Sequence, residues 1–94
     1  MGIFKEKQMT RPVLYALALL YKSNIIEHRP ITETQLREQL GVDRRVFDGV
    51  ALRLEQMGVR KTYYDHVGKI VDGLELTNMI LADAKNAYGV YFGK

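Results

Sequence analysis

The sequence contains no cysteine, a single serine, Ser23, and two histidines, His28 and His66. Without cysteine the chain can form no disulfide framework, no zinc site built on thiolates and no thiol nucleophile, and a reducing compartment is compatible with it. Nothing in the sequence places a nucleophile beside a base, and the acidic residues do not form a catalytic pair. We therefore expect a protein that is not an enzyme and that holds neither a metal nor a cofactor.

A long hydrophobic run is also missing. The longest one, residues 13–21, is too short to cross a bilayer and lacks the small-residue exit of a cleavable signal. Glu6 occupies the position at which a myristoylation motif beginning at Gly2 requires serine or threonine. We therefore expect a cytoplasmic protein without a membrane partner.

The residues that are present suit one small domain. The chain has 94 residues, 47% of them hydrophobic, which is ordinary for a folded protein of this size. Its 14 lysines and arginines exceed its 11 acidic residues by three, a mildly basic balance that permits contact with phosphate. A core this small is marginal, so a partner subunit that covers apolar surface would stabilise it.

Two residues that favour the start of a helix, followed by an apolar run, predict a first helix over residues 11–23. Thr10 offers a hydroxyl that can cap the helix, and Pro12 follows where a missing backbone N–H costs little. The helix is apolar on all sides, which indicates that more than one side is covered, either by its own domain or by another chain.

The next segment has the signals of two short helices joined by a tight turn. Residues 32–35, Thr-Glu-Thr-Gln, fit a capping box that begins a helix over residues 33–40. Gly41 ends that helix, and Asp43 can cap a third helix over residues 44–57. This arrangement is the helix-turn-helix pattern, in which the later helix can enter the major groove of DNA.

After Gly58, which ends the third helix, the pattern changes to that of strands. Residues 59–65 and 69–76 predict a hairpin that turns near Gly68, and Ile31 offers a very short third strand. Gly73 suggests a bulge in the second strand.

A fourth helix is expected over residues 78–88, capped by Thr77 and ended by Gly89. The apolar residues after it should fray unless something holds them. The chain is thus predicted to divide into an N-terminal arm, a folded domain and an apolar C-terminal end, at residues 1–9, 10–88 and 89–94.

These elements predict an α+β fold, mostly α, with three helices, a two-stranded hairpin and a fourth helix. The segment Leu40-Gly41-Val42-Asp43-Arg44-Arg45, followed by Phe47, Ala51, Leu54-Glu55 and Gly58-Val59, resembles winged-helix transcription regulators of the MarR-like and related bacterial and archaeal groups. The resemblance covers residues 10–88 as architecture, and its specific part, residues 32–59, identifies a superfamily. It implies a winged helix-turn-helix regulator whose third helix reads bases in double-stranded DNA while the hairpin touches the backbone or minor groove.

The residues themselves suggest which side chains would contact the DNA. Phe47, Val50, Ala51 and Leu54 have core spacing, which leaves Arg44 and Arg45 outside, at the helix end that meets base edges first and where they could pair with guanine or phosphate. Backbone contacts are expected from the third helix, the hairpin and the start of the second helix, namely Arg53; Lys61, His66 and Lys69; and Thr34, Gln35 and Arg37.

Other residues of the same helix argue against DNA. Asp48 repels phosphate, Gly49 offers no side-chain contact, and Leu52 suits an apolar partner. The alternative is a winged helix that binds a protein and no DNA, through an apolar surface that includes Leu52, Tyr63, Tyr64 and Tyr91-Phe92.

The apolar first helix, the amphipathic fourth helix and the apolar C-terminal end predict a homodimer. Two-fold symmetry would place two reading helices about one turn of DNA apart, matching a palindromic site. The competing interpretation is that the first and fourth helices pack on each other within one domain.

Overall fold

The computed structural model describes residues 10–93, and within its hairpin all side chains except those of Tyr64, His66, Lys69, Ile70 and Val71. The elements, in chain order, are helix α2 (Arg11–Tyr21), a π-helical turn η1 (Lys22–Ile26), helices α3 (Glu33–Leu40) and α4 (Arg44–Met57), strands β1 (Arg60–His66) and β2 (Lys69–Glu75), and helix α5 (Leu81–Phe92). The predicted α+β order is therefore confirmed from residue 10 onward. The arm expected over residues 1–9 lies outside the described residues.

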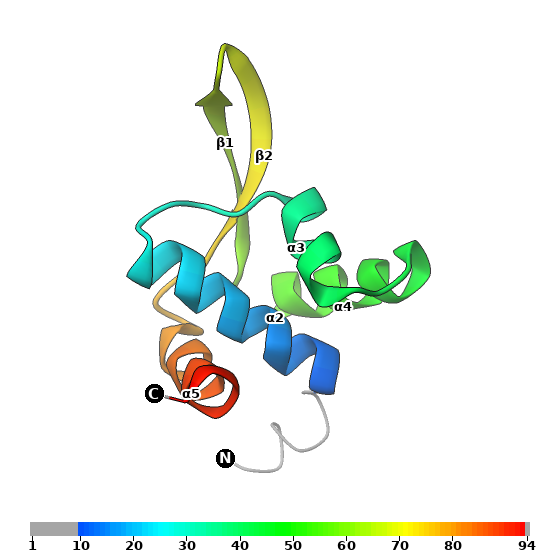
Figure 1. Ribbon diagram of the computed structural model, residues 1–94, viewed down its shortest axis with the longest axis vertical. Coiled ribbons are helices and arrows are strands. Elements are labelled where there is room, and N and C mark those ends of the chain that lie inside the picture. The colour runs from blue at the N-terminus through cyan, green and yellow to red at the C-terminus, as the bar shows by residue number, and fades with distance from the viewer. Residues whose placement is uncertain (1–9, 94) are drawn as a thin grey trace.

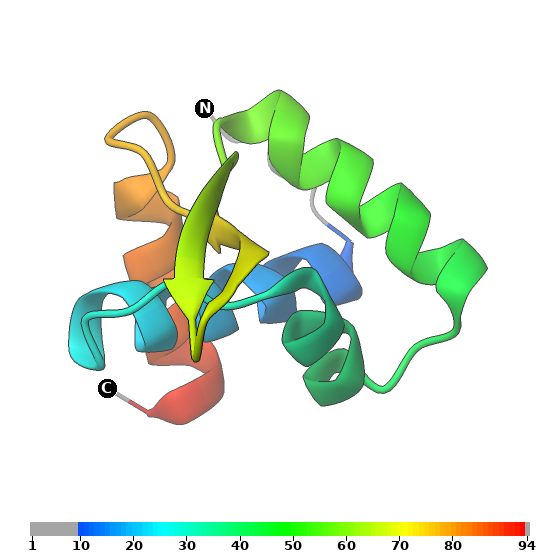
Figure 2. The same cartoon turned by 90° about the horizontal axis from the view of Figure 1, so that it is seen from above.

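Helix α2 forms the centre of the molecule. Figures 1 and 2 show α5 on one side of it and α4 on the other, while the hairpin rises on the side away from α5. Six residues of α2 are buried, on more than one side, and α3, α4 and α5 of the same chain contact the helix. Leu17 and Leu20 are fully buried in the core together with Leu36 of α3 and Leu54 of α4. Among the helices that the structure describes, none has the length and apolar character needed to span a membrane.

Two details of α2 differ from the prediction. The side chain of Thr10 makes no capping hydrogen bond. The α-helix ends at Tyr21 rather than at Ser23, because the chain widens into η1, where the Glu27 N–H donates to the Lys22 carbonyl at 2.9 Å, five residues back.

Polar side chains of the turn η1 hydrogen-bond to the loop that follows it and to a segment far along the chain. The Ser23 hydroxyl donates to the Arg29 carbonyl at 2.8 Å. The Asn24 amide nitrogen donates to the carbonyls of Arg29 and Leu74, at 3.0 and 3.4 Å, and its oxygen accepts from the Leu76 N–H at 2.7 Å. Asn24 therefore joins η1 to the root of β2, a contact that local sequence signals do not reveal.

The segment with α3 and α4 forms as predicted, with identical bounds. The Thr32 hydroxyl accepts from the Gln35 N–H at 3.0 Å, and the Gln35 side chain accepts from the Thr32 N–H at 3.1 Å, so the capping box is complete. Gly41 ends α3 in the left-handed conformation, with φ of 71°. Asp43 caps α4 by accepting from the Val46 N–H at 2.9 Å.

The hairpin is regular. Its strands pair antiparallel from Arg60 opposite Glu75 to His66 opposite Lys69, and residues 67 and 68 turn between them with positive φ. Gly73 pairs with Thr62 without interrupting the register, so the predicted bulge is absent. The short strand expected at Ile31 is an isolated bridge, in which the Leu74 N–H donates to the Ile31 carbonyl at 2.7 Å.

Helix α5 begins and ends later than predicted. Thr77 does not cap it: the helix starts only at Leu81, with Ile80 in the capping position, and the Thr77 hydroxyl donates instead to the Gly58 carbonyl at 2.6 Å. Gly89 lies within the helix, and Gly93 ends it with φ of 75°.

The end of α5 is held by aromatic contacts with α2. The ring of Tyr15 lies 5.0 Å from that of Tyr91 and 6.4 Å from that of Phe92, and Tyr21 lies 5.2 Å from Tyr88. Such pairs stabilise by about 0.5–1.5 kcal/mol beyond the burial of their area. Tyr91 and Phe92 are therefore held, which is the condition under which the sequence predicted no fraying of the C-terminal apolar residues.

Candidate nucleic-acid interface

The outward side of α4 carries a single ridge of residues. Phe47, Val50 and Leu54 are buried, as the spacing predicts, while Ala51 is only partly buried. Residues that follow one another by four, three and four positions lie on one side of a helix. The exposed ridge that they form opposite the core is Arg45, Gly49, Leu52 and Gln56. Gln56 was not among the contacts predicted from the sequence, although the same spacing would have identified it.

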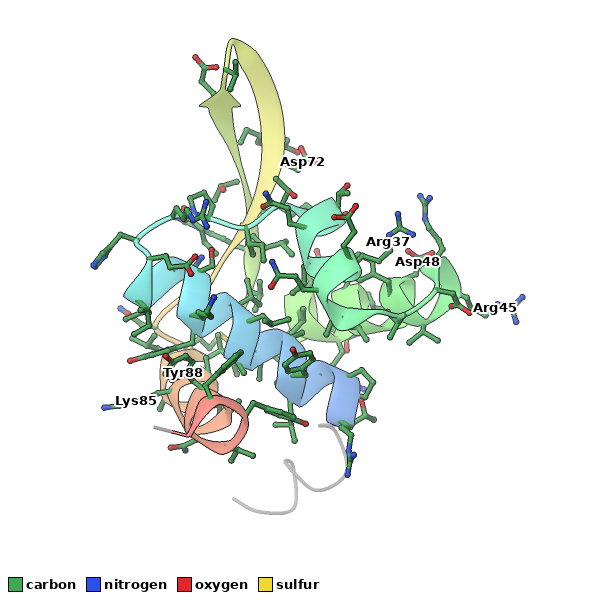
Figure 3. The ribbon with its side chains drawn as sticks, in the orientation of Figure 1. Arg37, Arg45, Asp48, Asp72, Lys85 and Tyr88 are labelled. Atoms are coloured by element: carbon green, nitrogen blue, oxygen red, sulfur yellow. The ribbon has the colours of Figure 1, made fainter. Side chains whose placement is uncertain are left out.

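Both predicted base-reading arginines are accessible. The Arg44 side chain is 80% exposed, and its Nε lies 4.0 Å from Oδ1 of Asp48, which is itself 70% exposed. An ion pair this open contributes little, so it does not withhold Arg44 from a phosphate. Figure 3 shows Arg45 pointing away from the body at the free end of α4, and within the described residues it makes no ion pair. The two guanidinium groups therefore stand where a polyanion could reach them.

The start of α3 adds polar groups on the hairpin side of the molecule. Thr34 and Gln35 are exposed, and Arg37 is partly exposed. The Gln35 side-chain oxygen is already engaged in the capping box, which leaves its NH₂ group as a donor. Figure 3 shows Arg37 and Arg45 at the same end of the molecule.

The remaining predicted contacts are less available or not described. Arg53 is partly exposed and donates from Nη1 to Oε1 of Gln56 at 2.8 Å. Lys61 Nζ lies 3.2 Å from Oε2 of Glu33, and this hydrogen bond raises the pKa of Lys61. The lysine therefore stays charged, but a carboxylate already accompanies it. The side chains of His66 and Lys69 lie outside those that the structure describes.

A groove of about 670 Å³ separates α4 from the hairpin. Its lining includes the buried apolar residues Phe47, Leu54, Val59 and Leu74. The charged residues that line it are the carboxylates of Glu33, Asp48 and Glu55 and the cations of Arg60 and Lys61, of which Lys61 is paired with Glu33. Two exposed apolar residues, Leu52 and Met79, also line it. The side of α4 that faces the hairpin is thus acidic and apolar, whereas its N-terminal end is basic.

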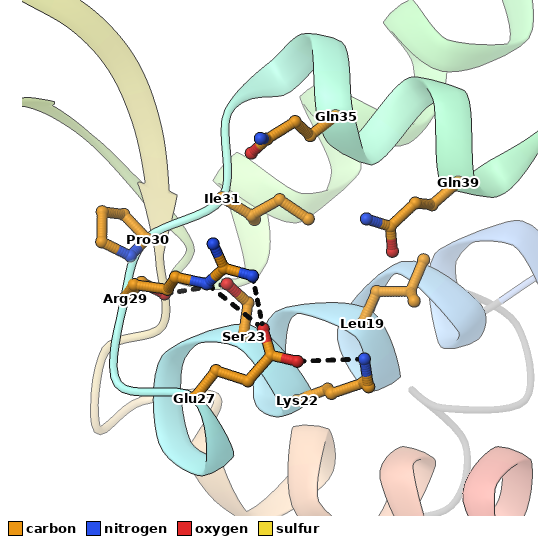
Figure 4. Close-up of a pocket in the computed structure, with 9 residues that line it drawn as sticks. All are labelled: Leu19, Lys22, Ser23, Glu27, Arg29, Pro30, Ile31, Gln35 and Gln39. Atoms are coloured by element: carbon orange, nitrogen blue, oxygen red, sulfur yellow. Dashed lines mark hydrogen bonds and ion pairs between the residues drawn. The ribbon is translucent and has the colours of Figure 1, made fainter. Parts of the chain in front are cut away.

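A second, smaller pocket of about 90 Å³ lies between η1 and α3 (Figure 4). There the Glu27 carboxylate is 3.0 Å from both Lys22 Nζ and Arg29 Nη2, and these two cations lower the pKa of Glu27. The pocket has room for a few water molecules, and its charges largely satisfy one another. Across the described residues, histidine and the acidic residues form no cluster that could hold a metal ion.

Comparison with solved structures identifies the architecture. The chain superimposes on the PcaV transcriptional regulator from Streptomyces coelicolor, crystallised in complex with its natural ligand, with a TM-score of 0.66 and 23% sequence identity. The fold is a winged helix-turn-helix. The hairpin is its wing, and α3 and α4 are its helix-turn-helix, which confirms the fold expected from residues 32–59.

The likeness covers nearly all of this chain but only part of PcaV. It extends over 93% of this chain and 57% of PcaV, so the chain spans a little over half of that regulator's length. No protein-family model and no curated protein sequence matches the chain. The winged helix is therefore shared as a fold, and the chemistry of the interface must be argued from the residues of this chain.

Proposed function

We propose that the protein is a DNA-binding transcription regulator that reads the major groove with α4 and touches the backbone with its wing. The observation that carries this proposal is the exposure of Arg44 and Arg45 at the N-terminal end of a capped, 14-residue helix. At 1.5 Å per residue such a helix is about 21 Å long, enough to lie in the groove while its first turn meets base edges.

The arrangement of the elements supports the same proposal. The wing and the start of α3 lie on the side of α2 that faces away from α5 (Figure 1). A duplex lying against α4 could therefore be contacted by Thr34, Gln35 and Arg37 from α3, by Arg53 on α4, and by Lys61, His66 and Lys69 from the wing. A regulator of this kind acts where the DNA lies, which agrees with the cytoplasmic location expected from the sequence.

We propose further that two copies bind one site. The apolar surface of α2 no longer supports a dimer, because α3, α4 and α5 of the same chain cover it. Near the end of α5, however, Val90 is 77% exposed, and Tyr91 and Phe92 are also exposed. Pairing through this end would leave both copies of α4 free, and such a two-fold dimer would bind two half-sites about one turn of DNA apart. Light scattering of the purified chain tests this: a monomer at micromolar concentration contradicts it.

The decisive experiment for DNA binding is a selection of bound sites from random duplexes, followed by a salt titration on the selected site. We expect log K to fall linearly with log salt, since phosphate contacts release counterions. The double variant Arg44→Ala plus Arg45→Ala should stay folded, lose enrichment and bind with a shallower salt dependence. The matched control removes two cations elsewhere, Arg11→Ala plus Lys85→Ala, and should change binding little.

A second candidate function is favoured by the groove beside α4. Its apolar floor and the carboxylates of Asp48 and Glu55 suit a basic, amphipathic segment of another protein, which is the adaptor alternative. Undetectable binding to duplex DNA at every salt concentration would contradict the regulator and favour the adaptor.

A further inference from the structure

Gly49 is a glycine that the fold of this chain does not require. It lies in the interior of α4, and it is not among the residues with positive φ. A Cβ atom built on it would meet nothing within 4 Å. Gly58 at the end of the same helix is different, because its φ is 116° and a Cβ there would lie 3.1 Å from side-chain atoms of Thr77 and Met79.

An exposed glycine inside a helix makes the folded state less stable than alanine would. Neither backbone conformation nor packing within the described chain offsets this at Gly49. Within the residues that the structure describes, nothing accounts for the missing side chain, and a partner that approaches the helix at that point would give it a physical use.

The position of Gly49 indicates what approaches. It lies on the outward ridge of α4, one turn after Arg45 and nearly one turn before Leu52, whose side chain is 55% exposed. The ridge is therefore cationic at its start, bare in its middle and apolar beyond. The major groove is about 12 Å wide, close to the diameter of a helix with its side chains, so removing one side chain lets the helix sit deeper.

We propose that Gly49 is the point where α4 comes closest to DNA, and that Leu52, brought down by this approach, contacts the C5-methyl group of a thymine. The inference rests on the proposed DNA-binding function and adds a specificity to it. Among the base edges in the major groove, the thymine methyl is the apolar one, and an apolar side chain is what recognises it. The role of Gly49 is then to let α4 approach the bases closely, because it has no side chain to hold the helix away.

Gly49→Ala tests the closest approach, because it should change stability and binding in opposite directions. We expect the melting temperature to rise by roughly 3–8 °C, as a better helix former replaces glycine, while affinity for the selected duplex falls about tenfold. The loss of binding then cannot come from unfolding. Gly89→Ala is the matched control: Gly89 is interior to α5, has no positive φ and has no atom within 4 Å of an added Cβ. It should be stabilised similarly and bind DNA as the unchanged protein does.

Replacing single thymines by uracil in the selected duplex tests Leu52, because this removes only the methyl group. One replacement should weaken binding about fourfold, the value for one buried methyl, and Leu52→Ala should abolish the difference between thymine and uracil at that position. If the unchanged protein binds DNA but Gly49→Ala binds equally well, or no uracil replacement matters, the inference is overturned and the regulator proposal stands. If the unchanged protein does not bind DNA, the proposed function itself fails.

Discussion

Asp48 is the first acidic residue within α4, after the arginines of its first turn. It lies one turn after Arg44, is 70% exposed, and lines the groove between α4 and the wing. A carboxylate so close to the N-terminal arginines repels phosphate and lowers the potential that attracts a duplex.

We therefore expect Asp48→Asn to strengthen DNA binding several-fold at low salt, with the gain shrinking as salt is added, because screening weakens the repulsion that was removed. Fluorescence anisotropy with a labelled duplex measures this. Asp83→Asn, which removes one carboxylate from α5, is the control. Equal affinity of Asp48→Asn and the unchanged protein at low salt would mean that α4 does not face the phosphates.

The capping box at Thr32 gives a second prediction at the scale of one residue. Thr32→Ala removes the hydroxyl that accepts from the Gln35 N–H, and we expect the free energy of unfolding to fall by about 1 kcal/mol. Chemical denaturation measures it. Thr34→Ala, which changes an exposed threonine two residues further along, should cost much less, so similar losses would show that the cap is not responsible.

At the scale of elements, the joint between α4 and the wing is tightly built. Gly58 is left-handed, and its carbonyl accepts from the Thr77 hydroxyl at 2.6 Å. An alanine here would adopt a strained backbone and push against Thr77 and Met79.

We expect Gly58→Ala to lower the free energy of unfolding by about 2–4 kcal/mol, the sum of backbone strain and crowding. Gly41 is also left-handed, but an added Cβ there would have open space around it. The free energy of unfolding of Gly41→Ala should therefore fall only by the cost of backbone strain, about 1–2 kcal/mol. Urea denaturation of both variants provides the comparison, and equal losses would contradict the crowding at Gly58.

Elements whose ends depend on neighbouring residues could be predicted from the sequence, and the others could not. The bounds of α3 and α4 follow from local caps, at Thr32 and Asp43, which is why they matched. In α5, Thr77 bonds to Gly58 instead of starting the helix, and aromatic rings packed against Tyr15 carry the helix past Gly89 to Gly93; both contacts are distant in sequence.

The same distinction, between features set by nearby residues and features set by distant contacts, applies to the candidate site. Helical spacing correctly placed Arg44, Arg45 and Leu52 on the surface, because a buried face determines its opposite. Spacing could not show that Glu33 accompanies Lys61, since these residues meet only when the wing folds beside α3.

At the scale of the whole molecule, one consequence concerns stability in acid. The Lys22 and Arg29 side chains hold the pKa of Glu27 below its ordinary value of 4.5. A carboxylate whose pKa is lower in the folded state stabilises the protein above the unfolded pKa, and this contribution disappears as pH falls through the folded pKa.

We therefore expect Glu27→Gln to lower the melting temperature slightly at pH 6 and by less at pH 3, because the stabilising contribution declines once the pH falls below the ordinary pKa of 4.5. The effect should be small because the cluster is exposed. Melting curves across this range measure it, with Glu38→Gln as a control for an exposed glutamate that makes no ion pair in the described part of the chain. An equal deficit at both pH values would exclude this cause.

The widened turn after α2 implies that chain length matters there as well as the identity of Asn24. Each residue rotates an α-helix by about 100°, so deleting one residue from Lys22–Ile26 would let the coil close into ordinary geometry while swinging the Asn24 amide away from β2. Helix α2 would become more regular, and β2 of the wing would lose the hydrogen bonds from Asn24 that hold its end. Insertions and deletions at this site would thus re-aim the wing without touching a single residue of α4.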